Sequence, residues 1–430
     1  MVGVGIVGLG TVGFDTYRIL RDYRSLIETR AGVDLRVVAV ADADPDRLKL
    51  IGEDPDVTTT TDAPRLIEDD RVEIVVELMG GTDAAFDYTK QAIALKKWVV
   101  TANKALLAER GEDLFGFADE QGSEIGFEAS VCGGIPVIRA IRDGLVGNRI
   151  HYMLGILNGT SNYILSRMAD EGIPFDKALA EAQRLGFAEK DPTLDIEGID
   201  AAHKLCILVR LALGFPMQMS EIATAGISKI EPIDIEFAKE FGYRIKLLGV
   251  AKEEENLIEA RVEPAMIPIK HPMSNVNEAY NAVYLVGDNV GSNLYYGKGA
   301  GGSPTGSAVV SDIVDMALRK TVGCSRRSPI ARKDGRSAKS AEKSMSPFYM
   351  RFKAQDTPGV LSRISGVLAN YNISIYAVVQ KGRKVDGYVP IVMLTYEASE
   401  GSLRKAKAEI DRLPFIGEET MHIRIEDREL

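Results

Sequence analysis

The segment from Gly186 to Leu205, GFAEKDPTLDIEGIDAAHKL, gathers five carboxylates and two lysines at the start of an otherwise apolar helix. Asp200 and Lys204 are four residues apart, so on a helix they share one face. The continuation from Leu205 to Phe215 is apolar almost all round, which is typical of a buried helix and indicates that this face points inward. A partly buried lysine needs carboxylate partners or a lowered pKa. The pattern therefore favours a chemical role over the ordinary alternative, an exposed salt bridge.

A glycine-rich turn near the N-terminus predicts a dinucleotide site. Val2 to Val7 is a short β-branched run, followed by GLGTVG at residues 8–13 and a helical stretch from Phe14 to about Thr29. The GxGxxG fingerprint requires this order of strand, turn and helix, because its glycines let the backbone approach a pyrophosphate. The helix N-terminus adds amide donors. A tight turn that merely tolerates glycine is the alternative.

Asp42 follows the second predicted strand, where it can accept hydrogen bonds from an adenosine ribose and so favour NAD. Arg47, five residues on, could instead receive a 2′-phosphate. Asp42 could also be only a turn residue before Asp44-Pro45, which resembles a helix cap followed by proline. The sequence leaves the choice between NAD and NADP open.

Two further segments place polar groups where a ligand could bind. Thr101-Ala102-Asn103-Lys104 follows a strand, at the edge where open α/β sheets bind ligands, so Lys104 could neutralise a cofactor phosphate or approach a substrate oxygen. The alternative is a simple helix start. Glu128 precedes a glycine-rich loop whose carbonyls could help it to hold a hard cation. A lone glutamate is more often solvated or salt-bridged.

The elements that must position these residues alternate between strands and helices in the first third of the chain. The predicted strands are Val2 to Val7, Leu35 to Ala41, Glu73 to Leu78 and Trp98 to Thr101, with a helix around Ala85 to Leu95. Each strand is a nearly continuous apolar run, which implies a parallel sheet buried on both faces. We therefore expect an N-terminal Rossmann-like domain at residues 1–134.

The rest of the chain predicts two more domains of an α/β protein. Residues 135–322 mix strands with helices and favour an α+β domain, whose helix from Ser307 to Leu318 is expected to pack on the first domain. Residues 323–346 are basic and rich in serine, which predicts a solvated linker. Residues 347–430 follow the order βαββαβ, which is ferredoxin-like.

Composition limits the classes of function. The 430 residues suggest roughly three domains, and 45% hydrophobic with 27% charged residues is typical of a soluble globular protein. A net charge of −10 argues against a nucleic-acid partner, and no apolar run is long enough to predict a membrane span. Three scattered cysteines, Cys132, Cys206 and Cys324, fit reduced thiols in a cytoplasmic protein, and neither they nor the histidines have zinc spacing.

At this point the motifs match a family. In chain order they are GLGTVG, VVTANKALLA, FEASVCGGIP, GILNGTSNYIL, GFAEKDPTLDIEGIDAAHKL and GKGAGGSPTGSAVVSDI. Over about residues 1–322 they strongly resemble homoserine dehydrogenase. The tail, with DTPGVLSRI followed by YNISI, resembles an ACT domain, a small amino-acid-sensing module. The resemblance implies that the middle domain is catalytic and forms the interface of a homodimer or higher homo-oligomer.

The resemblance also implies an activity: reversible hydride transfer between NAD(P)H and L-aspartate 4-semialdehyde, giving L-homoserine, in threonine and methionine biosynthesis. L-Threonine is the implied effector of the ACT domain. Two alternatives are a dinucleotide and amino-acid sensor without turnover, and another amino-acid dehydrogenase on the same scaffold. The presence of both Lys104 and Lys204 speaks against a sensor.

Roles for individual residues follow from the same resemblance. Lys204 matches the proton donor, and Lys104 matches a cofactor-contacting lysine that assists catalysis. Glu189 and Asp200 match substrate-holding residues, with Asp195 at another acidic position. The matching cofactor positions are Gly10, Thr11, Val12, Thr101, Lys104, Gly186 and Gly301. The glycine fingerprint adds Gly8 and Gly13 as cofactor-binding candidates, and the position after the second strand adds Asp42. The matching sodium ligands are Glu128 and the carbonyls of Val131, Gly133 and Ile135.

The sequence departs from the family pattern at Cys132 and Lys190, where alanine is expected. Lys190 adjoins Glu189 and so bears on the electrostatics of the substrate site. The pKa of Lys204 would be lowered by Lys104 and by burial but raised by Asp200 and Glu189. The direction of the net shift stays open.

Overall fold

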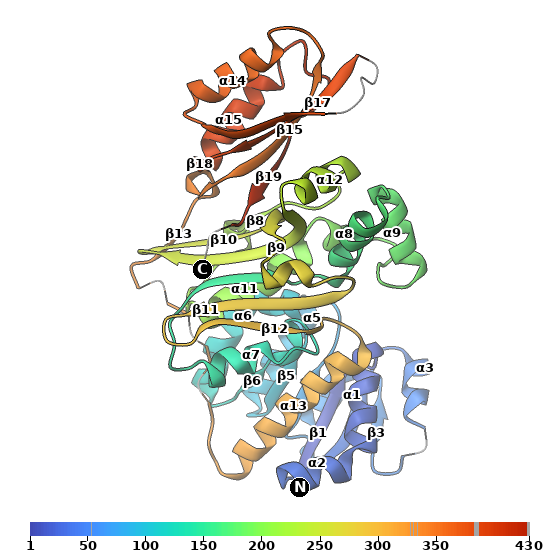
Figure 1. Cartoon of the computed structure of the whole chain (residues 1–430). Coiled ribbons are helices and arrows are strands. Elements are labelled where there is room, and N and C mark those ends of the chain that lie inside the picture. The colour runs from blue at the N-terminus through green and yellow to red at the C-terminus, as the bar shows by residue number, and fades with distance from the viewer. Residues whose placement is uncertain (53, 327, 330, 333, 382–386, 428–430) are drawn as a thin grey trace. The chain divides into compact units, whose positions relative to one another are not determined.

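The computed structural model describes residues 1–430 except 53, 327, 330, 333, 382–386 and 428–430 (Figure 1). The chain forms two compact units, each assembled from separate stretches of sequence. The first unit comprises Met1–Gly159, Asp200–Ser220 and Ala279–Arg336. The second comprises Thr160–Ile199, Glu221–Glu278 and Ser337–Leu430. Among the described residues, no helix is both long and apolar enough to cross a membrane.

The predicted Rossmann-like sheet is confirmed in the first unit. Its six strands lie in the order β3-β2-β1-β4-β5-β6, and all neighbouring pairs are parallel. The strands are β1 (Val2–Val7), β2 (Leu35–Ala41), β3 (Thr58–Thr60), β4 (Ile74–Glu77), β5 (Trp98–Thr101) and β6 (Ile125–Gly126). The short β3 and β6 lack the long apolar runs that identify the other four.

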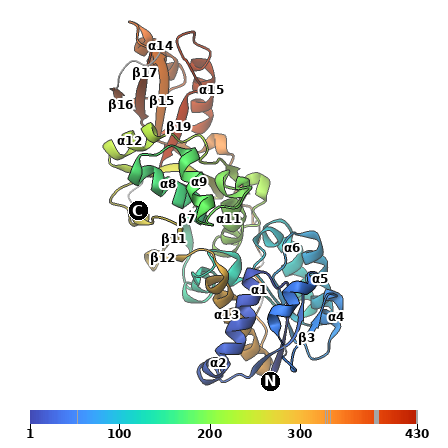
Figure 2. The same cartoon turned by 90° about the vertical axis from the view of Figure 1, so that its right-hand side faces the viewer.

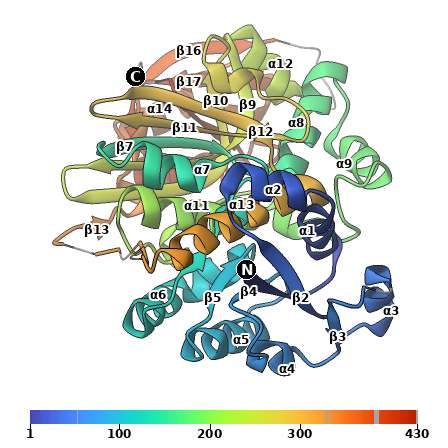
Figure 3. The same cartoon turned by 90° about the horizontal axis from the view of Figure 1, so that it is seen from below.

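Helices cover both faces of this sheet (Figures 2 and 3). One face carries α4 (Ala63–Glu68), α5 (Asp83–Ala94) and α6 (Lys104–Gln121), and the other carries α1 (Thr11–Asp22) and α13 (Gly302–Thr321). The predicted helix from Phe14 to Thr29 is in fact two helices, α1 and α2 (Arg24–Ala31). Helix α13 shares one hydrophobic core with β1, which confirms the expected packing of the later helix on the first domain.

The remainder of the first unit carries most of the polar residues of interest. Strands β7 (Ile150–Ile156), β11 (Tyr280–Gly287) and β12 (Gly291–Lys298) pair in antiparallel fashion. The short helix α7 (Val137–Arg139) follows the loop after Glu128, and α11 (Ile199–Ala212) is the predicted buried helix.

The second unit contains the confirmed ferredoxin-like module. Its order is β15 (Phe348–Gln355), α14 (Val360–Asn370), β16 (Ile375–Gln380), β17 (Tyr388–Thr395), α15 (Glu400–Ile410) and β19 (Met421–Ile425). Helices α14 and α15 lie on one face of the sheet and share a hydrophobic core with it (Figure 1). Strand β19 also pairs with β10 (Leu257–Pro268), which forms a long hairpin with β9 (Tyr243–Glu254).

Among the described basic residues of the predicted linker at 323–346, Arg332 and Lys343 are exposed, as expected, whereas three others have partners within the chain. Arg326 contacts Asp143 at 3.3 Å and Asp315 at 3.4 Å, and Arg336 donates to the carbonyl of Leu213 at 2.6 Å. In the second unit, Lys339 lies 2.9 Å from Glu254. The basic composition therefore reflects intramolecular acidic partners, which a single stretch of sequence does not reveal.

Candidate active site

Lys204 and Asp200 lie on one face of α11 and are both buried, as the four-residue spacing predicts. Lys204 Nζ is 2.7 Å from Asp200 Oδ2 and donates to the carbonyl oxygen of Leu157 at 2.7 Å. The amide of Asn158 donates to the same Asp200 oxygen at 2.8 Å. The carboxylate therefore holds the lysine ammonium on one side, and the end of β7 holds it on another.

Lys104 completes a group of three charges. Its Nζ lies 3.3 Å from Asp200 Oδ1, and its side chain is 40% exposed, whereas the side chains of Asp200 and Lys204 are each 10% exposed. Burial alone would raise the pKa of the Asp200 carboxyl, but Lys204 and Lys104 outweigh it and hold that pKa well below its usual range. Asp200 is therefore an anion shared by two lysines, one buried and one open.

The start of α6 positions Lys104. Asn103 caps this helix by accepting the N–H of Leu106 at 3.1 Å, and its own N–H donates to Thr101 Oγ1 at 2.9 Å. Thr101 in turn donates to Glu77 Oε2 at 2.6 Å. Glu77 is 1% exposed and ends β4, so one buried carboxylate organises two neighbouring strand ends. Burial raises the pKa of Glu77 despite these donors.

The glycines of the first turn have different tasks. A Cβ on Gly8 (φ +95°) would lie 2.6 Å from the carbonyl oxygen of Leu78, and one on Gly13 would lie 1.9 Å from that of Gly8. These two glycines let chain segments approach one another. Gly10 caps α1 and has open space beside it, where only Arg47 approaches a Cβ position, at 3.8 Å. The turn therefore leaves room for a ligand at the N-terminal end of α1, next to Thr11 and Val12.

Asp42 faces this turn. Its Oδ2 accepts the N–H of Leu9 at 2.6 Å, its Oδ1 accepts that of Asp44 at 2.9 Å, and Arg47 Nη1 lies 3.6 Å from Oδ2. Asp42 therefore holds the turn, and its role at an adenosine ribose stays a prediction. The side chain of Arg47 is 52% exposed beside the opening at Gly10.

Gly301 lies close to the same turn, because the N-termini of α1 and α13 meet. Gly301 caps α13 with φ +119°, and a Cβ on the next residue, Gly302, would lie 3.0 Å from Thr11 Cγ2. Thus the structure brings Gly8, Gly10, Thr11, Gly13 and Gly301 together, while the remaining predicted cofactor glycine, Gly186, belongs to the second unit.

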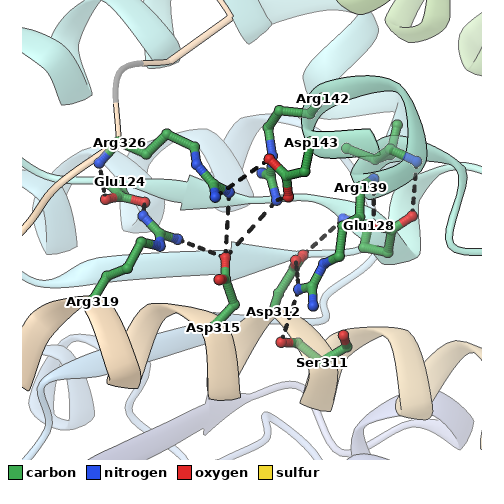
Figure 4. A network of polar contacts seen from close by, with 11 residues as sticks. Glu124, Glu128, Arg139, Arg142, Asp143, Ser311, Asp312, Asp315, Arg319 and Arg326 are labelled. Atoms are coloured by element: carbon green, nitrogen blue, oxygen red, sulfur yellow. Dashed lines mark hydrogen bonds and ion pairs between the residues drawn. The ribbon is translucent and has the colours of Figure 1, made fainter. Parts of the chain in front are cut away.

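Glu128 belongs to a buried polar network (Figure 4). Its two oxygens accept the N–H groups of Ile138 at 2.9 Å and Arg139 at 2.8 Å, while its own N–H donates to Asp312 at 2.8 Å. Burial and then the charge of Asp312 raise the pKa of Glu128 to about 7. Burial likewise raises the pKa of Asp312 to about 6. Burying two neighbouring carboxylates is costly while both are charged. Protonation of one of them, or a bound cation, would reduce that cost.

The predicted carbonyl ligands lie in the loop between Glu128 and α7. Gly133 has φ +34°, and a Cβ there would lie 2.9 Å from the carbonyl oxygen of Gly299, so this position suits only glycine. The carbonyl of Ile135 accepts the N–H of Val137 at 2.7 Å, and Val131 is fully buried. Within the described part of the chain, no group of three or more His, Cys, Asp or Glu residues could hold a metal ion.

The other predicted substrate residues belong to the second unit. Glu189 and Lys190 are exposed and follow α9 (Phe175–Arg184), and Gln183 donates to the carbonyl oxygen of Glu189 at 3.1 Å. Asp195 lies in α10 (Thr193–Ile196), where its carbonyl accepts Ser161 Oγ at 2.7 Å. Their substrate roles stay predictions.

Sequence reasoning missed Glu77 and Asn158. Glu77 is the penultimate residue of the predicted strand Glu73 to Leu78 and the last residue of β4, so an acid at the carboxyl edge of the sheet could have been noticed. Asn158 is 42 residues from Asp200, and no local pattern connects them.

Known proteins match the chain along most of its length. A family model described as homoserine dehydrogenase matches residues 136–314, and one described as the NAD-binding domain of homoserine dehydrogenase matches residues 8–128. An ACT domain model matches residues 348–415.

Individual proteins agree with these models. The homoserine dehydrogenase of Pseudomonas aeruginosa is 43% identical over 431 residues, with 99% of each chain covered. The crystal structure of a homoserine dehydrogenase from Thiobacillus denitrificans has a TM-score of 0.92 and 46% identity, covering 99% of this chain and 98% of that one. A hyperthermophilic archaeal homoserine dehydrogenase in complex with NADPH has a TM-score of 0.62 and 27% identity, covering 76% of this chain and 99% of that one.

Proposed function

This chain belongs to the homoserine dehydrogenase family, and from that premise we propose how its own residues carry out the NAD(P)-dependent reaction. The observation that carries the proposal is the group formed by Lys104, Asp200 and Lys204. When bound, the nucleotide supplies the hydride that reduces the aldehyde carbon of L-aspartate 4-semialdehyde. The protein has to orient the aldehyde and deliver one proton to its oxygen, which gives L-homoserine.

Lys204 is the proposed proton donor. Its ammonium is fixed at 2.7 Å from both Asp200 and the Leu157 carbonyl, so its position is defined before substrate binds. Lys104 is more open and offers a second positive charge to a substrate oxygen or a cofactor phosphate. The lone pairs that remain on Asp200 are a proposed acceptor for the substrate ammonium group. Glu189 and Asp195 keep the substrate-holding roles that the family resemblance implies.

The test is a spectrophotometric assay of the purified full chain with L-aspartate 4-semialdehyde and NADPH or NADH. We expect loss of nucleotide absorbance that depends on the semialdehyde, and the reverse reaction with L-homoserine. Other amino-acid aldehydes serve as controls for substrate class. Absence of turnover with the semialdehyde, together with turnover of another aldehyde, would contradict the proposal.

For the cofactor, we propose that the site accepts both NADH and NADPH. Asp42 uses an oxygen to hold the Leu9 amide, and Arg47 stands beside the opening at Gly10 with a half-exposed guanidinium. Asp42 supports ribose hydroxyl binding, whereas Arg47 supports binding of a 2′-phosphate. The solved relative in complex with NADPH is compatible with the second arrangement.

A sodium ion is proposed at Glu128 with the carbonyls of Val131, Gly133 and Ile135. Each Glu128 oxygen accepts one N–H and keeps a further lone pair, and burial beside Asp312 makes a neutralising cation favourable. A carboxylate with carbonyl oxygens is a hard donor set. The ion would hold the loop that joins β6 to α7.

We also propose that L-threonine inhibits the enzyme through the ACT module, as expected for an end product of threonine biosynthesis. Gly359, with φ +92°, caps α14 without a side-chain hydrogen bond, and the Val360 N–H donates to the carbonyl of Thr357 at 3.4 Å. The next amides of the first turn are the proposed donors to the carboxylate of the effector. Deleting the module is a poor test, because β19 and β13 (Ser337–Ala338) both pair with β10. Ser362→Asp in the full chain instead places a competing carboxylate at this exposed first turn, and Ser362→Asn is its uncharged control.

L-Threonine should inhibit the wild type and Ser362→Asn, while Ser362→Asp should lose the response with unchanged basal turnover. Inhibition that persists unchanged in Ser362→Asp places the effector elsewhere.

We further propose a homodimer or higher homo-oligomer through the middle domain, supported by exposed Leu294 and Tyr296 on the edge strand β12. Sedimentation of the wild type and Tyr296→Glu tests it, since loss of the edge should favour monomers.

A further inference from the structure

The carbonyl of Leu157 lies just beyond the last paired residues of β7 and β11, where side chains instead of backbone amides donate hydrogen bonds to it. Strands β7 and β11 pair in antiparallel register, with Ala282 opposite Ile156. Leu157 and Asn281 stand at the next position of the same register, beyond that pair. Here the Leu157 oxygen accepts Asn281 Nδ2 at 2.9 Å and Lys204 Nζ at 2.7 Å. Both lone pairs of this carbonyl are therefore used by side chains.

The Asn281 amide is held in one orientation. The residue is 1% exposed, and Nδ2 also lies 3.6 Å from Cys132 Sγ. A Cβ on Gly299 would come within 2.0 Å of the Asn281 Cγ atom, so only glycine leaves room for the amide there. Turning the amide over would place Oδ1 against the Leu157 oxygen, and two acceptors would repel one another.

This orientation has an energetic cost. Asn281 Oδ1 is buried and has no hydrogen-bond partner among the described residues. An unsatisfied buried acceptor destabilises the folded state, because it loses its hydrogen bonds to water. The buried Oδ1 atom does not stabilise the fold. The contribution of Asn281 to the site therefore lies in the hydrogen bond that its Nδ2 donates to Leu157.

We infer that Asn281 is a positioning residue for Lys204, acting through the Leu157 carbonyl. A lysine side chain has four flexible bonds, and its ammonium is fixed only by the groups that accept from it. Asn158 steadies Asp200 Oδ2, and Asn281 steadies the Leu157 oxygen, so each of these two Lys204 acceptors has its own amide support. This inference rests on the proposed role of Lys204 as proton donor, and Asn281 itself need not touch the substrate.

The test is Asn281→Leu, which keeps the side-chain volume and removes the donor. Displacing a reacting group by about 1 Å can cost up to ~10²-fold in rate, so we expect kcat to fall roughly 10- to 100-fold. The solvent deuterium isotope effect on kcat should rise, because proton transfer becomes slower, while the Kd for NADPH stays unchanged. Asn148→Ala is the control, since its amide contacts Leu145 and Val290 away from Lys204, and it should leave turnover unchanged.

A double variant separates positioning from general stability. In the background of Lys204→Met, Asn281→Leu should cause no further loss, because its effect passes through the lysine. If Asn281→Leu fails to fold, Asn281→Ser carries the same comparison with a smaller side chain that cannot bridge to Leu157. Losses that add in the double variant, or wild-type kcat and isotope effect in the single one, would overturn the inference. Full activity of Lys204→Met alone would instead refute the proposed function.

Discussion

Two buried charge clusters, one in each unit, differ in how many carboxylates contact each cation. In the second unit, Asp234 is 0% exposed and both of its oxygens bond to Arg351, at 2.7 and 3.2 Å, while Tyr349 donates to it at 2.9 Å. Arg351 also contacts Glu231 and Glu418. In the first unit, one carboxylate, Asp200, contacts two lysines, Lys104 at 3.3 Å and Lys204 at 2.7 Å.

The difference indicates what each cluster is for. A planar guanidinium matched to a carboxylate leaves no group free to react and fixes α12 (Pro232–Glu240) against β15. Two ammonium groups on one carboxylate carry an excess positive charge, and Lys104 is partly open to solvent. An unbalanced cluster of this kind suits a reaction in which negative charge develops on a substrate oxygen. The paired cluster should therefore govern stability, and the unbalanced one should govern turnover.

The largest expected effect is on turnover. Lys204→Met removes the proposed proton donor and should lower kcat by about 10²- to 10⁴-fold. Cofactor binding should change little, and the loss of unfolding free energy should be smaller than in Arg351→Met, because Asp200 keeps Lys104 as a cation. Lys97→Met is a matched control, because Lys97 is also buried in the first unit but donates to the carbonyl of Asp69 at 2.6 Å. Steady-state kinetics and thermal denaturation of both variants make the measurement. A near-normal kcat in Lys204→Met would contradict the claim that the cluster of the first unit governs turnover.

The paired cluster should show the opposite response. Arg351→Met leaves Asp234 buried without its cation, and breaking a buried pair typically costs about 3 to 5 kcal/mol of unfolding free energy. The kcat of the enzyme that remains folded should be close to normal. Arg404→Met, which removes a half-exposed partner of Glu400, should cost at most about 1 kcal/mol. Urea denaturation compares them, and equal midpoints for the two variants would contradict the structural role.

The contrast also explains which parts of the molecule the sequence could predict. Strands β1, β2 and β5 have the predicted boundaries, because each is a nearly continuous apolar run that ends at a polar or glycine residue. The Asp200–Lys204 pair was predictable because both residues lie on one helix face. The parts of the site that depend on local periodicity were therefore available without coordinates.

The partners of these residues come from distant segments and were not predictable. Asn281 is 124 residues from Leu157, and Arg351 is 117 residues from Asp234. The same limit applies to Arg326, whose acidic partners Asp143 and Asp315 turn a predicted solvated segment into a bonded one. Whether a charge is paired or unbalanced is a property of the tertiary structure.

Glu128 and Asp312 form a third buried group, in which two carboxyls lie close together, and its effect on stability should depend on pH. The pKa of Glu128 is raised to about 7 from 4.5, so its contribution to stability is present below pH 4.5 and is lost as the pH rises through 7. Glu128→Gln should therefore flatten the fall in unfolding free energy across this range, by an amount on the order of 3 kcal/mol. Denaturation at several pH values, with exposed Glu112→Gln as control, makes the comparison. Sodium in place of choline should flatten the wild-type profile only, and identical profiles for wild type and Glu128→Gln would exclude this role.

The smallest expected effect concerns Arg47, whose pairing with Asp42 is open to solvent. If Arg47 receives a 2′-phosphate, Arg47→Ala should weaken NADPH relative to NADH by about 1 kcal/mol, or roughly fivefold in Kd. Asp42→Asn should act in the opposite direction, since it removes a negative charge but keeps an oxygen for the Leu9 amide. Lys49→Ala, which removes an exposed cation paired with Asp46 on the same segment, is the control. Kd values for both nucleotides with each variant decide the matter, because a purely electrostatic surface effect would make Lys49→Ala and Arg47→Ala alike. A selective loss of NADPH binding in Arg47→Ala would show that even a half-exposed, weakly paired charge in the first unit is placed for a ligand.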